Sequence, residues 1–301
     1  MKKIEYKDID VLQAQYLDAF QGWCHRHQPE WSNLRMDVPD LQVFPDLLSD
    51  ILIAKVESLV NWYYQYTRMN INGATIDKVK TIFKYKGQNQ SRISGFLMDH
   101  AEDLEIGICH YCETAYINSY QSGKRKRNHF DIDHFLPKSV CPVTALSLFN
   151  LVPSCPVCNE RLKKNNILGD TAEETIMHCP TSDIYDFEEQ VSICVIPTEA
   201  YHSIHYQDNP DKYKIQFITC SKDFDKEIRM FKLNERYDFH KCEALRLMDL
   251  KQDYPDSHIR MIADLLGREG VFIKESIFGE YFVDKNSRLF AKLHRDILKD
   301  S

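Results

Sequence analysis

The chain has 301 residues, of which 43% are hydrophobic, and its formal net charge is −7. This length allows two or three domains with buried cores, and the acidic balance argues against a surface that attracts nucleic acid everywhere. The first residues lack the apolar stretch of a signal peptide. The best apolar run, residues 51–54, is broken by Lys55, so we expect no membrane span and a cytoplasmic protein.

The first part of the chain is predicted to be helical, and we assign residues 1–105 to an N-terminal helical domain. Apolar residues recur at helical spacing from Asp8 to Cys24 and again from Pro45 to Tyr66. Pro45 suits the first turn of the second helix, where a missing N–H costs nothing. A third helix is predicted from Ser91 to Leu104, with Ser91 as its cap.

Two Cys-x-x-Cys pairs follow, Cys109 with Cys112 and Cys155 with Cys158. Four thiolates in two such pairs are the ligand set of a closed, tetrahedral structural zinc site. The 42 residues between the pairs exceed the usual zinc-finger interval, so they form an insert with its own structure. We assign residues 106–170 to a core that is braced by this zinc, since so small a unit buries too little apolar surface alone.

The insert contains a predicted strand that carries acidic and imidazole side chains. Residues 129–135 alternate as in a half-buried strand that Pro137 ends. After the second cysteine pair, residues 159–164 are predicted to form a short helix that Gly169 stops. The core is therefore expected to run strand, long loop, second strand and helix.

Basic side chains gather in this core although the chain is acidic. Residues 109–170 hold eight Lys/Arg and five Asp/Glu, a local charge of +3, which leaves −10 for the remainder. Clustered basic groups can bind the phosphates of a nucleic acid. A solvated turn after Ser122-Gly123 explains the first cluster equally well. The candidate phosphate-binding residues are Lys124, Arg125, Lys126, Arg127, Arg161, Lys163 and Lys164.

Residues 171–301 are predicted to form a mixed strand and helix region that packs on the core. Val191–Ile196 and Tyr213–Thr219 have the composition of strands. The chain then turns helical from Phe224. Further helices are predicted at Lys241–Leu250, Ser257–Leu266 and Arg288–Lys299.

The motifs of the core, taken in order and spacing, resemble the HNH endonuclease family in its variant with a four-cysteine zinc. The resemblance rests on the cysteine pairs, Asp133-His134, Asn150-Leu151 and the Cys158-Asn159 junction. It implies an α+β fold, a mostly helical chain with a central zinc-braced ββα-metal nuclease core. It also implies a metal-dependent endonuclease that hydrolyses phosphodiester bonds in DNA.

The same resemblance gives roles to individual residues. His134 would be the general base, because an imidazole titrates near neutrality. Asp133 and Asn159 would ligate one divalent ion, and oxygen ligands favour magnesium or manganese. Asn150 would pin the loop that holds the histidine. Asp131 is either an additional or supporting group of the metal site or a simple acid on the strand face.

The layout around the core most resembles the HNH subunits of Septu-type and retron-associated antiphage systems, in which the nuclease works beside an ABC/SMC-like ATPase. This implies a prokaryotic defence effector whose helical flanks bind a protein partner. Two alternatives stay open, an interbacterial toxin nuclease and a non-catalytic zinc module that binds nucleic acid. The absence of a delivery-type segment and the central core weigh against the first. Retained Asp133, His134 and Asn159 weigh against the second.

Overall fold

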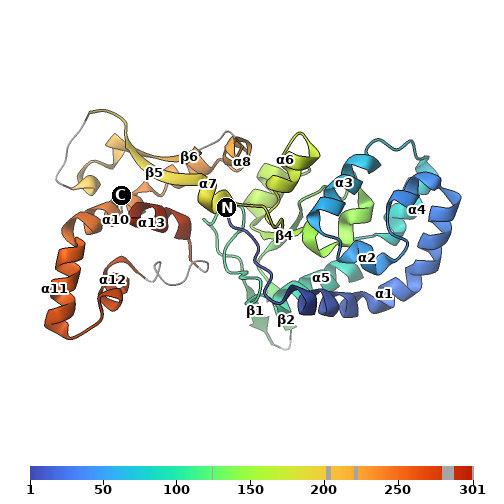
Figure 1. Ribbon diagram of the computed structural model, residues 1–301, viewed down its shortest axis with the longest axis horizontal. Helices are drawn as coiled ribbons and strands as arrows, with labels where there is room; N and C mark the ends of the chain where they lie inside the picture. Colours follow the sequence, from blue (N-terminus) through green and yellow to red (C-terminus); the bar gives the residue numbers. More distant parts are fainter. Residues whose placement is uncertain (124, 201–204, 220–222, 280–287, 300–301) are drawn as a thin grey trace. The chain divides into compact units, whose positions relative to one another are not determined.

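The computed structural model describes residues 1–123, 125–200, 205–219, 223–279 and 288–299. Within these ranges the chain folds into helices and three two-stranded antiparallel sheets, an α+β arrangement (Figure 1). It divides into two compact units, residues 1–111 with 117–186, and residues 112–116 with 187–301. The N-terminal helices and most of the cysteine-bracketed segment therefore lie in the same unit.

The helix α1 (Ile9–Asp37) supplies much of the apolar interior of the first unit. The helix predicted to end at Cys24 continues through Pro29, because Trp31 and Leu34 extend its buried face. Both residues are buried, at 0% and 4% exposure, and the Trp31 ring packs edge-on against another aromatic ring. The buried side chains of α1 are Leu12, Tyr16, Phe20, Trp23, Trp31 and Leu34.

The single helix predicted from Pro45 to Tyr66 is wrong, since the structure has two, α2 (Leu48–Leu52) and α3 (Val56–Tyr66). Lys55 separates them in an extended conformation, with φ −66° and ψ 160°. Apolar periodicity continues across the break because both helices bury their apolar faces in the same interior. The break is therefore hidden in the sequence pattern.

Two further helices complete the N-terminal part. The helix α4 (Gly73–Ile82) was not predicted, although the side chain of its cap, Asn72, accepts a 2.8 Å hydrogen bond from the Thr75 amide. The helix α5 (Gln88–Asp99) begins before Ser91 and follows Gly87, so Ser91 is not its cap. The short loop between α4 and α5 carries Tyr85.

The central segment contains two hairpins and a short helix. Strands β1 (Ser119–Ser122) and β2 (Arg125–Asn128) pair with each other, as do β3 (Asp131–His134) and β4 (Leu151–Ser154). The loop from β3 to β4 includes η2 (Pro142–Leu146) and η3 (Leu148–Asn150).

The short helix after β4 is the π-helix η4 (Val157–Lys163), which packs against β3. It begins earlier than the predicted residue 159, and Lys164, with φ 54°, ends it. Gly169 does not stop this helix. It lies in the turn that precedes α6 (Ala172–Met177) and has φ 90°.

The second unit is built on a hairpin of two seven-residue strands, β5 (Val191–Pro197) and β6 (Tyr213–Thr219), which confirms the two predicted strands. The helix α13 (Ala291–Leu298) packs on β5, and α10 (Lys241–Asp253) packs on α13. The prediction missed α12 (Gly270–Phe278). The other helices among the described residues of this unit are α7 (Phe187–Gln190), η5 (Tyr206–Asp208), η6 (Pro210–Lys212), α8 (Asp225–Met230), α9 (Leu233–Asp238) and α11 (Asp256–Leu266).

Candidate metal centre and hydrolytic site

The four cysteines of the two pairs come together in the structure. The sulfur atoms of Cys109, Cys112, Cys155 and Cys158 all lie within 4.8 Å of one another, and all four residues are buried. Zinc–sulfur bonds of about 2.3 Å in a tetrahedron place the sulfurs roughly 3.8 Å apart, so the cluster can hold zinc. The Cys155 amide also donates a 3.2 Å hydrogen bond to Sγ of Cys109, which favours the thiolate that zinc requires.

The β3–β4 hairpin presents the acidic and imidazole side chains. Asp133 lies opposite Val152 and His134 opposite Leu151. Successive side chains of a strand point to opposite faces, and the contacts follow this rule. Asp131 and Asp133 interact with the π-helix, whereas the His134 ring points to the loop from β3 to β4.

The His134 ring is held in one tautomer. Its Nε2 lies 2.9 Å from the carbonyl oxygen of Ala145, which can only accept a hydrogen bond, so Nε2 carries the proton. Nδ1 therefore presents its lone pair. Burial lowers the pKa of His134 well below its ordinary value, the ammonium of Lys138 lowers it further, and the Ala145 carbonyl opposes this shift. The imidazole is therefore neutral and Nδ1 can accept a proton, but the lowered pKa makes it a weaker base than the imidazole titrating near neutrality that the sequence led us to expect.

Two side chains that the motif does not contain cover this ring. The ammonium of Lys138 lies 3.2 Å from Nδ1 of His134 and 5.0 Å from the centre of the Tyr85 ring. The Tyr85 ring meets the imidazole edge-on, with centroids 4.5 Å apart. His134 is consequently only 4% exposed. Lys138 follows His134 by four residues in the sequence, whereas nothing in the sequence signals the approach of Tyr85.

Asp133 is enclosed by hydrogen-bond donors. Its carboxylate accepts a 2.6 Å hydrogen bond from the Tyr111 hydroxyl and lies 3.0 Å from the Lys163 ammonium. Lys163 also donates to the carbonyl of His134 at 3.0 Å, and its side chain has no exposed surface. Lys163, expected among the phosphate-binding residues, is thus a buried counter-ion in the structure.

Asn159 and Asp131 form a second polar pair. The Asn159 amide donates to the Asp131 carboxylate at 3.2 Å. Burial raises the pKa of Asp131, and the hydrogen bond from Asn159 opposes that rise. Both side chains are half-buried, so their oxygen atoms lie closer to solvent than those of Asp133. Asp131 and Asn159 offer the oxygen donors that magnesium and manganese prefer, and Asp133 could join them only through oxygens that already contact Tyr111 and Lys163.

Asn150 closes the loop that follows His134. Its amide nitrogen donates to the carbonyls of Leu136 and Thr144 at 3.1 and 3.0 Å, and its side-chain oxygen accepts from the Leu136 amide at 2.7 Å. Helices of the N-terminal part hold the same loop, since Tyr16 donates to the Leu146 carbonyl and Ser147 to that of Ile51. The loop that carries the Ala145 carbonyl is therefore fixed from both sides.

The remaining basic candidates lie at the surface or outside the described residues. Arg127, Arg161 and Lys164 are exposed. Lys126 is also exposed and bonds to the end of α5, donating to the Met98 carbonyl at 2.6 Å. Lys124 lies outside the described residues, and Arg125 is described only as part of β2.

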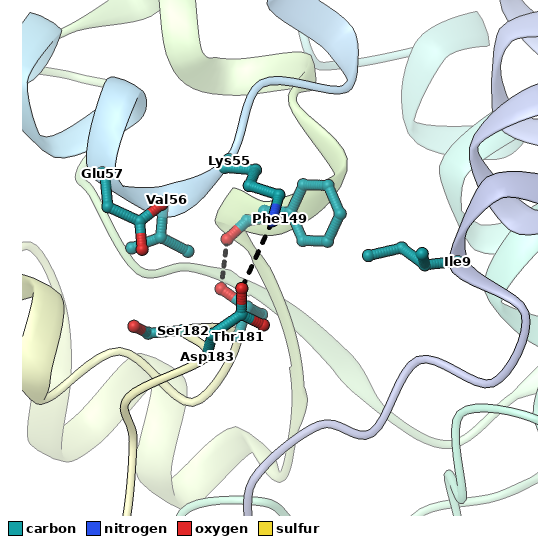
Figure 2. A pocket seen from close by; sticks show the side chains of 8 residues that line it. All are labelled: Ile9, Lys55, Val56, Glu57, Phe149, Thr181, Ser182 and Asp183. Atoms are coloured by element: carbon teal, nitrogen blue, oxygen red, sulfur yellow. Dashed lines mark hydrogen bonds and ion pairs between the residues drawn. The ribbon is translucent and has the colours of Figure 1, made fainter.

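A small hollow of about 220 Å³ opens elsewhere in the first unit (Figure 2). Figure 2 shows the contacts across it, between Lys55 and Asp183 and from Thr181 to the Phe149 carbonyl. Those 220 Å³ include open solvent, and the enclosed space is about 10 Å³, far below the roughly 300–1,000 Å³ of small-molecule pockets. None of its lining residues is a predicted site residue. The lining residues are Ile9, Lys55, Val56, Glu57, Phe149, Thr181, Ser182 and Asp183.

The chain matches no protein-family model, no curated protein and no solved structure. None of the helices that the structure describes has the length and apolarity to span a bilayer. The structure shows a buried four-cysteine cluster that can bind zinc, in an α+β chain.

Proposed function

We propose that the chain is a metal-dependent endonuclease of the HNH type that hydrolyses phosphodiester bonds in DNA. The observation that carries the proposal is His134, a buried neutral imidazole with Nε2 fixed on the Ala145 carbonyl and Nδ1 left as an acceptor. His134 follows directly after Asp133 on the β3–β4 hairpin. The second strand of this hairpin, β4, is followed directly by Cys155 of the four-cysteine cluster.

In the proposed reaction, water attacks phosphorus while Nδ1 of His134 takes the proton that the water loses. The bond from phosphorus to the 3′ oxygen breaks, and the leaving oxygen takes a proton from solvent. A magnesium or manganese ion held by Asp133 and Asn159, with Asp131 as a further ligand, would offset negative charge on the phosphate and leaving group. Asn150 keeps the loop and its Ala145 carbonyl in place, so the tautomer of His134 is maintained.

The test compares His134→Ala with His129→Ala, which removes an exposed histidine near the start of the same strand. Plasmid DNA and a structured RNA are incubated with each variant and magnesium or manganese. We expect His134→Ala to slow cleavage by about 10²–10⁴-fold and to keep zinc content and melting temperature, whereas His129→Ala stays close to the parent. Cleavage by His134→Ala at the parent rate would refute the assignment. DNA binding without any cleavage by the parent would favour a non-catalytic zinc module.

We further propose that this nuclease is the cytoplasmic effector of a prokaryotic antiphage system and is controlled by an ABC/SMC-like ATPase. Apolar side chains exposed on neighbouring helices of the second unit suit such a partner surface. Co-expression with the neighbouring gene, followed by size-exclusion chromatography, tests this; a fully active protein with no associated partner would contradict it. The exposed side chains are Met261, Leu265 and Leu266 on α11 and Val271 and Phe272 on α12.

A further inference from the structure

Lys138 stands where the proposed reaction needs a free lone pair. Its ammonium donates to Nδ1 of His134 at 3.2 Å, and Nε2 of the same ring is already engaged by the Ala145 carbonyl. A water molecule cannot transfer its proton to Nδ1 while the lysine holds that lone pair. The arrangement of Lys138 and His134 is therefore a blocked base.

The side chain of Lys138 is held less tightly than the other side chains of the site. Lys138 is half-buried, whereas Asp133, His134 and Asn150 are buried. The ammonium of Lys138 contacts a neutral imidazole and the face of Tyr85, and neither group carries a formal charge. A hydrogen bond between two charged groups is roughly twice as strong as one between neutral groups. A phosphate oxygen would thus compete well for this ammonium.

Tyr85, which lies in the N-terminal part of the chain, holds the Lys138 ammonium in its position beside His134. The loop that carries it is closed by Asn89, whose amide donates to the Lys84 carbonyl at 2.8 Å. It is anchored by Phe83, a buried ring that packs on Trp23 and Trp31. Because Tyr85 sits on a fixed loop, its ring can hold the lysine at one place over the imidazole.

We propose that Lys138 binds the scissile phosphate and that this binding frees the base. On arrival of nucleic acid, the ammonium moves from Nδ1 of His134 to a non-bridging phosphate oxygen, and the vacated Nδ1 accepts a hydrogen bond from the attacking water. The inference rests on the proposed nuclease function and adds a residue that touches the substrate. It also links substrate binding to the exposure of the base, so the enzyme does not present an open Nδ1 until a phosphate is present.

The kinetic test uses Lys138→Met, which keeps the length of the side chain, and Lys138→Arg, which keeps its charge. Lys80→Met on α4 is the matched control, since Lys80 is exposed. Single-turnover cleavage of a fluorescent DNA duplex in magnesium is expected to fall on the order of 100-fold in Lys138→Met, to fall less in Lys138→Arg and to stay at the parent rate in Lys80→Met. Zinc content and melting temperature verify folding. Cleavage by Lys138→Met at or above the parent rate overturns the proposal.

A spectroscopic test follows the ring itself. The ¹⁵N chemical shift of His134 Nδ1 reports whether that atom accepts a strong hydrogen bond, and His134→Gln assigns the signal. Adding the duplex without divalent ions should move this signal in the parent, whereas Lys138→Met should show the shifted position from the start. An unchanged signal at saturating duplex overturns the role of Lys138. An inactive His134→Ala beside a fully active Lys138→Met leaves the nuclease proposal standing and removes only this inference; a fully active His134→Ala removes the nuclease proposal.

Discussion

The buried ion pair of Asp133 and Lys163 joins β3 to the π-helix. Neither side chain reaches water, with exposures of 2% and 0%. Such pairs add little net stability compared with apolar residues of similar size, but breaking one by removing a single partner is costly. Asp133 thus has a structural task in addition to the metal role proposed for it.

Replacing Lys163 by Met should destabilise the first unit by about 3–5 kcal/mol, because the Asp133 carboxylate then stays buried without a counter-ion. Chemical unfolding monitored by circular dichroism measures the change. Asp133→Asn in the same chain should restore part of the loss. Lys164→Met, at the exposed next position, should change the free energy of unfolding by less than about 0.5 kcal/mol. Equal effects of Lys163→Met and Lys164→Met would show that the pair does not matter.

The candidate site residues differ in how far the sequence could predict their contacts. The members of the four-cysteine cluster follow from spacing alone, because two Cys-x-x-Cys pairs are the usual ligand set of a structural zinc and the structure brings their sulfur atoms together. The partner of Asn159 is Asp131 and that of Asp133 is Lys163, and these pairings depend on how the π-helix lies against β3. No local pattern encodes that placement. Tyr85 reaches His134 from a distant loop, so only the tertiary fold could reveal it.

Helix boundaries, and the presence of α4 and α12, were predicted less well than the strands of the second unit. The predicted strands of the β5–β6 hairpin match the structure because alternation and bounding turns mark them locally. The break between α2 and α3 was missed, since Lys55 interrupts the backbone without interrupting the apolar pattern. Similarly, η4 ends at Lys164 in a positive-φ conformation, and lysine gives no sequence signal for such an ending.

Gly169 lies in the turn before α6 and does not end η4 as predicted, and substitution can test its role in this turn. A Cβ at this position would lie 2.5 Å from the Thr175 amide nitrogen, at φ 90°. Gly169→Ala should therefore cost more than about 2 kcal/mol of stability, because backbone strain and a backbone clash add. Gly267→Ala, at the end of α11 with φ 63° and no atom within 4 Å of its Cβ, should cost only about 1 kcal/mol. Thermal unfolding of both variants measures this difference; equal losses would exclude the clash.

Metal removal should affect the whole protein. We expect one tightly bound zinc ion per chain. Cys155→Ser should lose both this ion and cooperative melting, because the free energy of binding a structural zinc contributes directly to the free energy of folding. Metal analysis by mass spectrometry and calorimetry measure both effects. Cys242→Ser is the control, since this thiol is exposed and outside the cluster. A stable Cys155→Ser protein with full zinc content would contradict a structural zinc site.

Acid should destabilise the protein through its buried histidines. Burial lowers the pKa of His110 to about 3 and that of His294 to about 4, and it lowers that of His134 as well. Unfolded histidines have a pKa near 6.5, so below that pH the unfolded state binds more protons, and stability falls as pH falls toward the folded values.

Each buried histidine should contribute little above pH 6.5 and a slope that approaches about 1.4 kcal/mol per pH unit below it. Urea unfolding between pH 7.5 and 5 in saturating zinc measures the sum. His294→Gln should reduce the slope, while His25→Gln, at an exposed position on α1, should not. A pH-independent stability over this range would show that these histidines are not neutral in the folded protein.

Residues 112–116 belong to the second unit, although the rest of that unit begins only at residue 187. Glu113 accepts hydrogen bonds from the amides of Phe290 and Lys292, which lie 177 and 179 positions later in the chain. At roughly 5–20 residues per second, a ribosome needs about 9–36 s to make that interval. During synthesis, Glu113 therefore waits for these two partners, and this is the period in which a chaperone or a protease would meet it without them.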